Sequence, residues 1–421
     1  MTLVDFFSPV RSGTTAHLDS AIWPHGARYD ADGRIMVGGV ALADIAETYG
    51  TAARVVDEHE VRLRCRAYRK TFPEAEIAYA ATALLIGVVA DWVTDEGLSM
   101  AVHSSGELAA ALAAGVDPKR IILHATGLSR EELATAVTQR VNRIVLGSLA
   151  EIDVLASVAT RTQRVLLRLD PGIERDTRQS AAGFALGTPA AAAVAQVLAA
   201  PTLELIGFSC HLGSQLYNPD HYGEAIRRMI AEMAQVRHDH DRLLTDLDLG
   251  GGHAIAYRSG DAEMNLPELS AIIEDALDAG CARQHFPRPN VALEPGRGIV
   301  ARAGVTLHRV MSVKHSDGGH VSVVIDSAAR ARSGDGAGMV VANRRATGPQ
   351  VTATVAGRAG DVILATGVRL PADLRPGELL AVPCTGAYHH STTRTRVIAV
   401  RAGQYAQLVH REPDFLDRDA S

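Results

Sequence analysis

Lysine is rare in this sequence, and its cysteines are few and widely separated. Lys70, Lys119 and Lys314 are its only lysines among 42 basic residues, so any chemistry that requires a lysine amine has three candidates. The four cysteines are scattered and show no CxxC spacing. This usage is typical of a reduced, cytoplasmic protein and argues against a disulfide-bonded fold or a zinc site with cysteine ligands.

Long apolar runs and an excess of one charge are absent as well. No stretch reaches 18 uninterrupted apolar residues, and residues 1–5 lack the basic and apolar pattern of a secretion signal, so we expect no membrane span and no export. The formal net charge is −6, with acidic and basic residues interspersed, which argues against nucleic acid as a partner. A chain of 421 residues has room for a barrel of about 250 residues and a second domain.

Short apolar runs alternate with amphipathic runs rich in Ala and Leu through the middle of the chain. Eight apolar runs are predicted to be strands, at residues 76–80, 99–103, 120–124, 143–147, 164–169, 204–211, 245–249 and 290–294. The segments between them are long enough for helical crossovers between parallel strands. This pattern predicts an α/β fold with a (β/α)₈ TIM-type barrel.

After residue 305 the pattern changes to strands joined by Gly, Asp and Pro turns. Predicted strands at 305–313, 321–325, 351–355, 378–382 and 395–400 indicate a C-terminal all-β domain. Turn residues within 29–33 and 37–40 predict an N-terminal hairpin that completes this domain. The expected division is therefore residues 1–45 contributing to the β domain, 46–305 as the barrel, 306–412 as the β domain and 413–421 as a tail.

The carboxyl ends of the predicted barrel strands carry several polar residues, and barrels place their active sites at this end. These residues are His103, His124, Arg168, His211, the glycines Gly250, Gly251 and Gly252, and the segment 294–297. A glycine loop lets backbone N–H groups approach an anion, although the same glycines suit a plain strand-to-helix turn. Glu294 and Arg297 need a ligand, or each other, if they are buried.

Four segments resemble the signature motifs of fold-type III decarboxylases that depend on pyridoxal phosphate (PLP), in particular actinobacterial diaminopimelate decarboxylase. The segments are HLGSQ (211–215), DLGGG (248–252), EPGR (294–297) and PCTGAYHHS (383–391). The resemblance covers nearly the whole chain. It implies an alanine-racemase-like barrel with a β domain, a small amino-acid-like substrate, and a homodimer with active sites at the interface.

Carried over by position, the resemblance implies that the PLP-binding residues are present. His211 would stack on the pyridine ring, Glu294 would face the ring nitrogen and Tyr388 would close the pocket. The phosphate would be held by Ser214, Gly250, Gly251, Gly252 and Arg297, and Gly296 would be a further cofactor-binding residue.

The residues that carry out catalysis in the family differ here. Thr82 stands where the family has its Schiff-base lysine, and Ala101 stands in place of an aspartate. The family's Cys-Glu segment reads GRAGD at 357–361. The three lysines all lie away from the predicted barrel mouth, so none replaces the missing amine. PLP decarboxylation needs an imine to the substrate amine, which the free aldehyde can form without lysine.

Extra histidines surround the predicted pocket. His103, His253 and His389 stand where we expect other residue types in the family. These histidines show no HxH or HxxxH spacing, so we expect a polar pocket without a metal site. The candidate catalytic residues are His211, Tyr388, His103 and His124. The candidate substrate-binding residues are Arg168, His253 and His389.

Three hypotheses for the function follow from the retained and missing residues. We favour an enzyme that keeps the PLP-phosphate cradle but has changed its chemistry on an amino-acid-like substrate in a specialised biosynthetic pathway. A catalytically inactive pseudoenzyme that binds a ligand or regulates a partner is the first alternative. A PLP-dependent decarboxylase with a non-covalently held cofactor is the second. We expect PLP to be bound only non-covalently, or to be replaced by another phosphate-bearing ligand or none.

Overall fold

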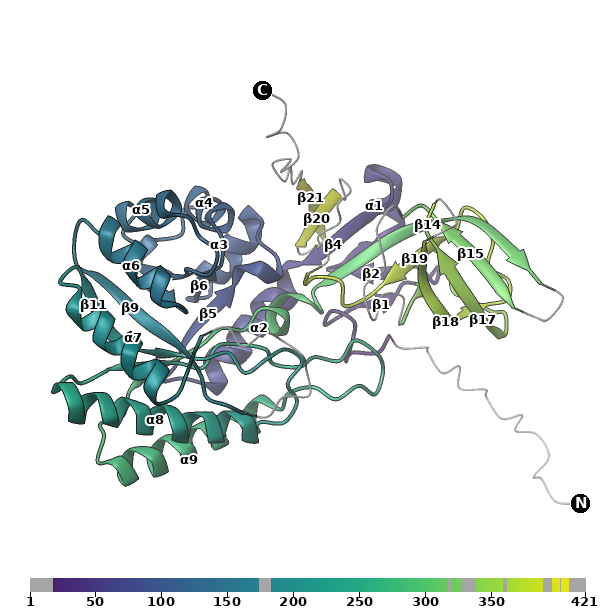
Figure 1. Ribbon diagram of the computed structural model, residues 1–421. Helices are drawn as coiled ribbons and strands as arrows, with labels where there is room; N and C mark the ends of the chain where they lie inside the picture. Colours follow the sequence, from purple (N-terminus) through teal and green to yellow (C-terminus); the bar gives the residue numbers. More distant parts are fainter. Residues whose placement is uncertain are drawn as a thin grey trace, which may run out of the picture.

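The central unit of the fold is a closed barrel of parallel strands (Figure 1). The computed structural model describes residues 18–173, 183–316, 320–327, 338–358, 362–388, 396–401 and 403–408. The barrel strands are β5 (Glu76–Ala80), β6 (Ser99–Val102), β7 (Ile121–His124), β8 (Arg143–Leu146), β9 (Gln163–Asp170), β11 (Leu203–Ser209), β12 (Asp246–Asp248) and β13 (Asn290–Leu293). Strand β13 pairs with β5 and closes the barrel, and the short β10 (Phe184–Ala185) pairs with β9. The predicted barrel is confirmed.

Helices connect these strands and cover the outside of the barrel. They are α3 (Gly87–Asp95), α4 (Ser105–Ala113), α5 (Arg130–Thr138), α6 (Leu149–Val158), α7 (Thr188–Ala199), α8 (Asp220–His240) and α9 (Leu266–Gln284), with the short α10 (Arg297–Val300) after β13. Serine side chains cap the N-termini of α4, α5 and α6, and Ser129 forms a capping box with Glu132 at α5. These caps fix the loops in which the barrel strands end.

The interior of the barrel explains why its strands read as continuous apolar runs. Apolar side chains from six strands form a buried cluster, made of Ala78, Ala101, Ile122, Val145, Leu166 and Ile206. The alternate residues of the same strands pack outward against the helices in a larger core. Both faces of each strand are therefore removed from water, as parallel barrels require. Ala101, one of the departures from the family motif, is fully buried in the inner cluster.

The second unit is a β domain beside the barrel (Figure 1). Its strands are β4 (Ala53–Asp57), β14 (Gly304–His315), β15 (Val321–Ile325), β16 (Val340–Val341), β17 (Gln350–Ala356), β18 (Ile363–Pro371), β19 (Leu379–Val382), β20 (Arg396–Arg401) and β21 (Gln404–Leu408). Strand β4 lies between β14 and β20 in this sheet, although the expected boundary at residue 46 assigned it to the barrel. The domain boundaries themselves remain predictions.

The N-terminal segment packs on this β domain. Strands β1 (Arg28–Tyr29), β2 (Ile35–Val37) and β3 (Val40–Ala41) form a small antiparallel sheet that leads into α1 (Leu42–Tyr49). Ile35 shares a buried apolar cluster with Val305 and Ile398, and its backbone N–H donates to the carbonyl of Ala342 at 2.9 Å. This is the expected association of the hairpin with the C-terminal strands.

The chain does not pass directly from β5 into a helix. It first forms the 3₁₀ turn η1 (Ala81–Ala83), and α3 begins only at Gly87. The carbonyls at this turn have other partners: the Tyr79 hydroxyl donates to Leu84 O at 2.6 Å, and the Tyr388 N–H donates to Ala83 O at 2.8 Å. The turn thereby joins the barrel mouth to the end of the β domain.

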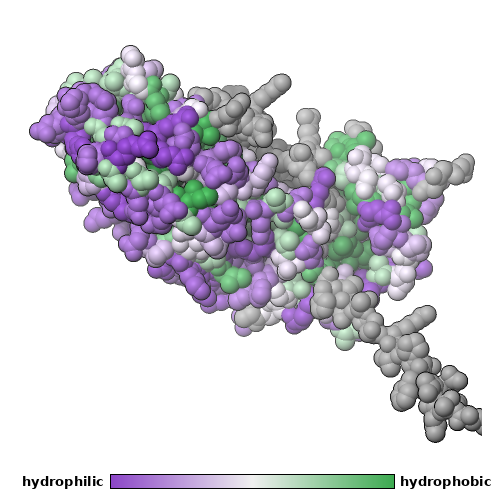
Figure 2. All heavy atoms as spheres, turned by 90° about the horizontal axis from the view of Figure 1, so that it is seen from below, coloured by the Kyte–Doolittle hydropathy of each residue, from purple (hydrophilic) through white to green (hydrophobic). Residues whose placement is uncertain are grey.

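One face of the molecule is mostly polar over the barrel. Figure 2 shows hydrophilic residues over most of the visible face of the barrel, with hydrophobic ones scattered between them. Among the residues that the structure describes, no helix has the length and apolar character needed to cross a lipid bilayer. The predicted tail 413–421 and His389 lie outside the described residues.

Candidate active site

A cavity of about 290 Å³ opens at the carboxyl ends of the barrel strands. Its lining residues come from the loops after several of these strands and from the β domain: Ala80, Thr82, His103, His211, Gly213, Ser214, Gly251, Gly252, His253, Glu294, Pro295, Gly296, Arg297, Gly298 and Tyr388. Most of the residues proposed from the sequence therefore meet at one place. Among the proposed residues that the structure describes, three do not line the cavity: His124, Arg168 and Gly250.

Arg297 forms a positive end of the cavity. Its Nη2 donates to the Ser214 hydroxyl, and its Nη1 lies 3.3 Å from Gln215 Oε1 and 3.4 Å from the Tyr257 hydroxyl. The guanidinium carbon lies 4.9 Å from the centre of the Tyr388 ring, which is a cation–π contact. No carboxylate is bonded to Arg297 among the hydrogen bonds of the described residues, so its charge is directed at the cavity. This end suits an anion.

The glycine loop after β12 lies against the same end. A Cβ on Gly252 would come within 2.0 Å of Gly213 O, and one on Gly251 within 2.1 Å of Glu294 O, so only glycine fits at either position. Gly250 differs, because its N–H donates to Asp248 Oδ1 at 2.8 Å. The predicted contact of Gly250 with a phosphate is therefore corrected: its amide already has a partner, and the loop offers Gly251 and Gly252 instead.

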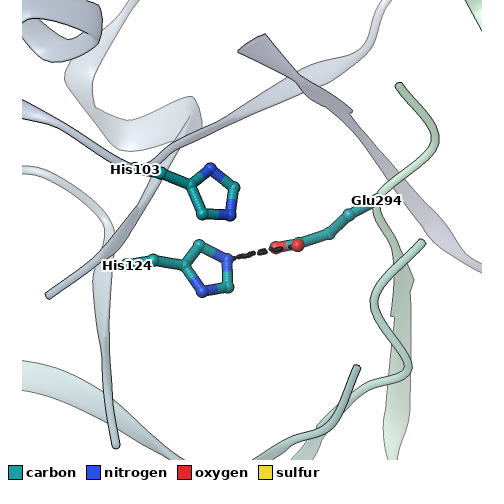
Figure 3. Close-up of side chains that lie close together, drawn as sticks. All are labelled: His103, His124 and Glu294. Atoms are coloured by element: carbon teal, nitrogen blue, oxygen red, sulfur yellow. Dashed lines mark hydrogen bonds and ion pairs between the residues drawn. The ribbon is translucent and has the colours of Figure 1, made fainter. Parts of the chain in front are cut away.

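Another part of the cavity wall holds the imidazole of His103 and the carboxyl group of Glu294, and the imidazole of His124 lies next to both (Figure 3). His124 Nε2 lies 3.0 Å from Glu294 Oε1 and 3.1 Å from Oε2. The rings of His103 and His124 stack with centroids 4.2 Å apart and planes 6° from parallel. His103 lines the cavity, while His124 is buried beneath it at 5 % exposure. His124 is therefore not placed to touch a ligand directly, as was expected of a catalytic residue.

Burial sets the ionisation of these groups. It raises the pKa of Glu294 to about 7, against a hydrogen bond with Asp248 and the charge of Arg143, both of which lower it. It lowers the pKa of His124 to about 4 and holds the pKa of His103 well below its usual value. Both imidazoles are therefore neutral at pH 7, and Glu294 exchanges a proton near that pH.

Two candidate substrate-binding residues occupy different places. His253 lines the cavity and its Nδ1 lies 3.0 Å from the hydroxyl of Tyr68, on α2 (Glu58–Thr71). Burial lowers the pKa of His253 to about 4, so it is a neutral wall of the pocket. Arg168 lies in β9, outside the set of lining residues, with a buried Nε that has no hydrogen-bond partner.

Thr82 lies in the cavity wall, at the position to which the resemblance assigns a lysine. Its side chain has no amine. Lys70 is in α2, Lys119 is in the 3₁₀ turn η2 (Pro118–Arg120) before β7, and Lys314 is in β14. No lysine is present among the described residues that line the cavity.

Sequence reasoning missed several residues that support the site. Gln215 and Asp248 stand inside the HLGSQ and DLGGG motifs, so a signal for them existed. Tyr68 and Tyr257, which bond to His253 and Arg297, carried no such signal. Tyr68 lies in α2, far from any motif, and Tyr257 lies in the loop after DLGGG but outside the motif itself.

These residues fit PLP in two respects. The positive end with Arg297 and Ser214 matches a phosphate, and the acid of Glu294 in the same cavity matches a basic ring nitrogen. The Gly251 and Gly252 backbone allows close approach of the loop. What the described lining residues of the cavity do not supply is a lysine for covalent attachment.

Comparison with known proteins identifies relatives over the whole chain. Residues 58–301 match the family model "Pyridoxal-dependent decarboxylase, pyridoxal binding domain". The chain is 39 % identical to a diaminopimelate decarboxylase of Actinosynnema pretiosum subsp. auranticum, covering 100 % of both chains. It is 34 % identical to the diaminopimelate decarboxylase of Mycobacterium tuberculosis strain H37Rv, over 94 % of this chain and 96 % of that one.

A solved structure has the same fold. The diaminopimelate decarboxylase of M. jannaschii in complex with L-lysine superposes with a TM-score of 0.82 at 22 % identity, covering 91 % of this chain and 94 % of that one. The family to which the matching model belongs uses PLP.

These relatives correct the functional hypothesis that we favoured. An enzyme with changed chemistry in a specialised pathway, and an inactive pseudoenzyme, were both inferred from the missing catalytic residues. Full-length relatives at 30 to 39 % identity are diaminopimelate decarboxylases, which supports an ordinary decarboxylase instead. The chain belongs to the pyridoxal-dependent decarboxylase family.

Proposed function

We propose that this chain is a PLP-dependent amino-acid decarboxylase that acts on diaminopimelate and holds PLP without a covalent bond to its own side chains. One observation carries the proposal: the cavity keeps an anion-binding end and an acid for a ring nitrogen, yet no lysine is found among its described lining residues. The names of the full-length relatives supply the reaction and the substrate class.

In this proposal the phosphate lies between Arg297, Ser214 and the amides of Gly251 and Gly252. Arg297 contributes a full charge and a planar fork of N–H donors, which suits phosphate oxygens. The Tyr388 ring already lies against the guanidinium and limits its movement. The phosphate contacts therefore hold the cofactor in place where the family also uses a lysine.

Other residues that line the cavity would orient the ring of the cofactor. His211 would pack on one face of the ring, and Glu294 would meet the ring nitrogen. When bound, PLP supplies an electron sink for the electrons that remain on the substrate α-carbon as carbon dioxide leaves. His103, His211 and Tyr388 line the cavity and are the candidates for handling protons there.

Substrate recognition in this proposal involves His253, which lines the cavity, and Arg168, which does not line it but whose charge acts on His103 and Glu294. His253 presents a neutral imidazole fixed by Tyr68, and Arg168 offers a cation to a substrate carboxylate. The L-lysine in the M. jannaschii structure is consistent with a linear diamino acid in such a pocket. A homodimer is part of the same proposal, because the family motifs imply active sites at a subunit interface.

The test is release of carbon dioxide from diaminopimelate by purified protein, with and without added PLP. We expect release that requires PLP, stops after dialysis and returns when PLP is added again. Lysine and ornithine serve as alternative substrates, and Arg297→Met is the control in which the phosphate site is removed. Saturation with PLP but no release from any of the three amino acids would contradict the proposal.

A further inference from the structure

His124 makes an unusual pair of contacts for a residue that does not line the cavity. Its Nε2 is nearly equidistant from the two oxygens of Glu294, at 3.0 and 3.1 Å. Its Nδ1 is buried and has no hydrogen-bond partner. An unpartnered buried N–H costs more than an unpartnered acceptor, so the favoured tautomer carries its proton on Nε2 and donates it to the carboxyl group.

The stacked ring of His103 fixes the orientation of this donor. Parallel imidazoles with centroids 4.2 Å apart limit rotation of His124 about its side-chain bonds, and the main-chain N–H of His103 is held at 2.8 Å by Glu107 Oε2. Figure 3 shows both rings on one side of the carboxyl group, with only His124 bonded to it.

The same three side chains are close enough to suggest a metal site, since their ligand atoms lie within 4.8 Å of one another. The stacking argues against it. A metal bound to an imidazole nitrogen lies in the plane of that ring at about 2.0–2.1 Å. Two stacked rings occupy separate planes, so one ion cannot lie in the plane of both unless the stack is broken. The arrangement suits hydrogen bonding to Glu294 instead.

We propose that His124 is a positioning residue: by donating to Glu294 it holds the carboxyl group aimed at the ring nitrogen of PLP, and His103 locks it in place by stacking. The inference rests on the proposed function, because it assumes PLP in the cavity. A carboxyl group has enough lone pairs to accept hydrogen bonds from two partners. One oxygen would accept from the protonated ring nitrogen, while the other accepts from His124 Nε2.

The surroundings explain why Glu294 needs a donor. It is 5 % exposed, and burial disfavours its charged form. The charged or titratable groups that act on it are Asp248 from β12, Arg143 from β8, Arg168 from β9 and Glu76 from β5, besides His124 from β7. Asp248 is itself buried, and burial raises its pKa well above the usual value, which disfavours a second carboxylate charge beside Glu294. His124 is the neutral donor that supports ionised Glu294 when the cofactor nitrogen is protonated.

The experiment compares two ligands on three proteins by equilibrium titration. The ligands are PLP and its deaza analogue, in which C–H replaces the ring nitrogen. The proteins are wild type, His124→Phe, which keeps an aromatic face for His103 but has no donor, and His124→Gln, which keeps a donor. A merely structural role for His124 would weaken both ligands equally.

We expect His124→Phe to bind PLP about tenfold to a hundredfold more weakly than wild type, as loss of a hydrogen bond to a charged group predicts, and to bind the deaza analogue as wild type does. His124→Gln should recover most of the PLP affinity. Binding of the analogue shows in the same titration that the variant pocket is folded. Equal losses for both ligands, or unchanged PLP affinity in His124→Phe, would overturn the inference. A wild-type protein that binds neither ligand would overturn the proposed function and this inference with it.

Discussion

Replacing Arg297 by methionine is predicted to weaken PLP binding selectively through the phosphate. Methionine fills much of the same volume but removes the donors that reach Ser214, Gln215 and Tyr257, and the cation over Tyr388. These neighbours are neutral side chains, so they leave the positive charge of the guanidinium uncompensated and available to a phosphate.

The size of the effect follows from the number of charged hydrogen bonds to the phosphate. A hydrogen bond to a charged group contributes about 1.5–3 kcal/mol, and each 1.4 kcal/mol is tenfold in affinity, so removing one such bond weakens binding about 10- to 150-fold. If Arg297 binds the phosphate through two parallel bonds, removing both places the effect at or beyond the upper end of that range. Arg297→Lys keeps the charge but not the planar fork, so we expect an intermediate effect.

The assay is a fluorescence or calorimetric titration with PLP and with pyridoxal, which lacks the phosphate. Arg297→Met should weaken PLP and leave pyridoxal nearly unchanged. The control is Arg288→Met, because Arg288 is exposed and pairs with Glu274 and Asp278 on the outside of the barrel. An equal loss for pyridoxal, or no loss for PLP, would refute the assignment of Arg297 to the phosphate.

Three further predictions concern the attachment point, the glycine loop and the buried acid. Thr82→Lys should form a covalent adduct with PLP that borohydride reduction traps on residue 82, whereas Thr82→Met should form none. If Thr82→Lys binds PLP but forms no adduct, this position does not face the cofactor aldehyde. Gly252→Ala should abolish PLP binding or unfold the loop, because its Cβ would meet Gly213 O at 2.0 Å, whereas Gly87→Ala, with nothing within 4 Å, should behave as wild type in titration and thermal unfolding. Glu294 has a folded pKa of about 7 against an ordinary value of 4.5, so the folded state binds more protons and the free energy of unfolding falls as pH rises from 4.5 through 7. The measurement is urea unfolding of the wild type and of Glu294→Gln at about pH 5 and about pH 8. The difference in the free energy of unfolding between the two pH values should be smaller in Glu294→Gln, by up to about 3 kcal/mol. An identical pH dependence in the wild type and the variant would contradict the assignment.

The barrel could be predicted from the sequence because parallel strands buried on both faces leave a local record. The predicted strand 76–80 coincides with β5, and the other seven agree to within two residues at each end. Strand β4 could not be placed in the same way. Its apolar run pairs with β14 and β20, which follow hundreds of residues later, and no local pattern encodes such a partner.

The candidate site was predictable in composition but not in contacts. The motifs correctly predicted that Ser214, Glu294 and Arg297 line one cavity, because the carboxyl ends of all barrel strands lie on one face of the barrel. They did not reveal that His124 lies under His103, because stacking depends on side-chain rotamers and on the relative height of β6 and β7. The functional hypothesis failed for a related reason: missing catalytic residues were given more weight than the resemblance that extends over the whole chain.

The measurement that tests the central claim most directly is borohydride reduction of the wild-type protein saturated with PLP, followed by intact-protein and peptide mass spectrometry. The account predicts saturable PLP binding with no reduced pyridoxal phosphate attached to any lysine of the chain. A stoichiometric adduct on Lys70, Lys119 or Lys314 would contradict it.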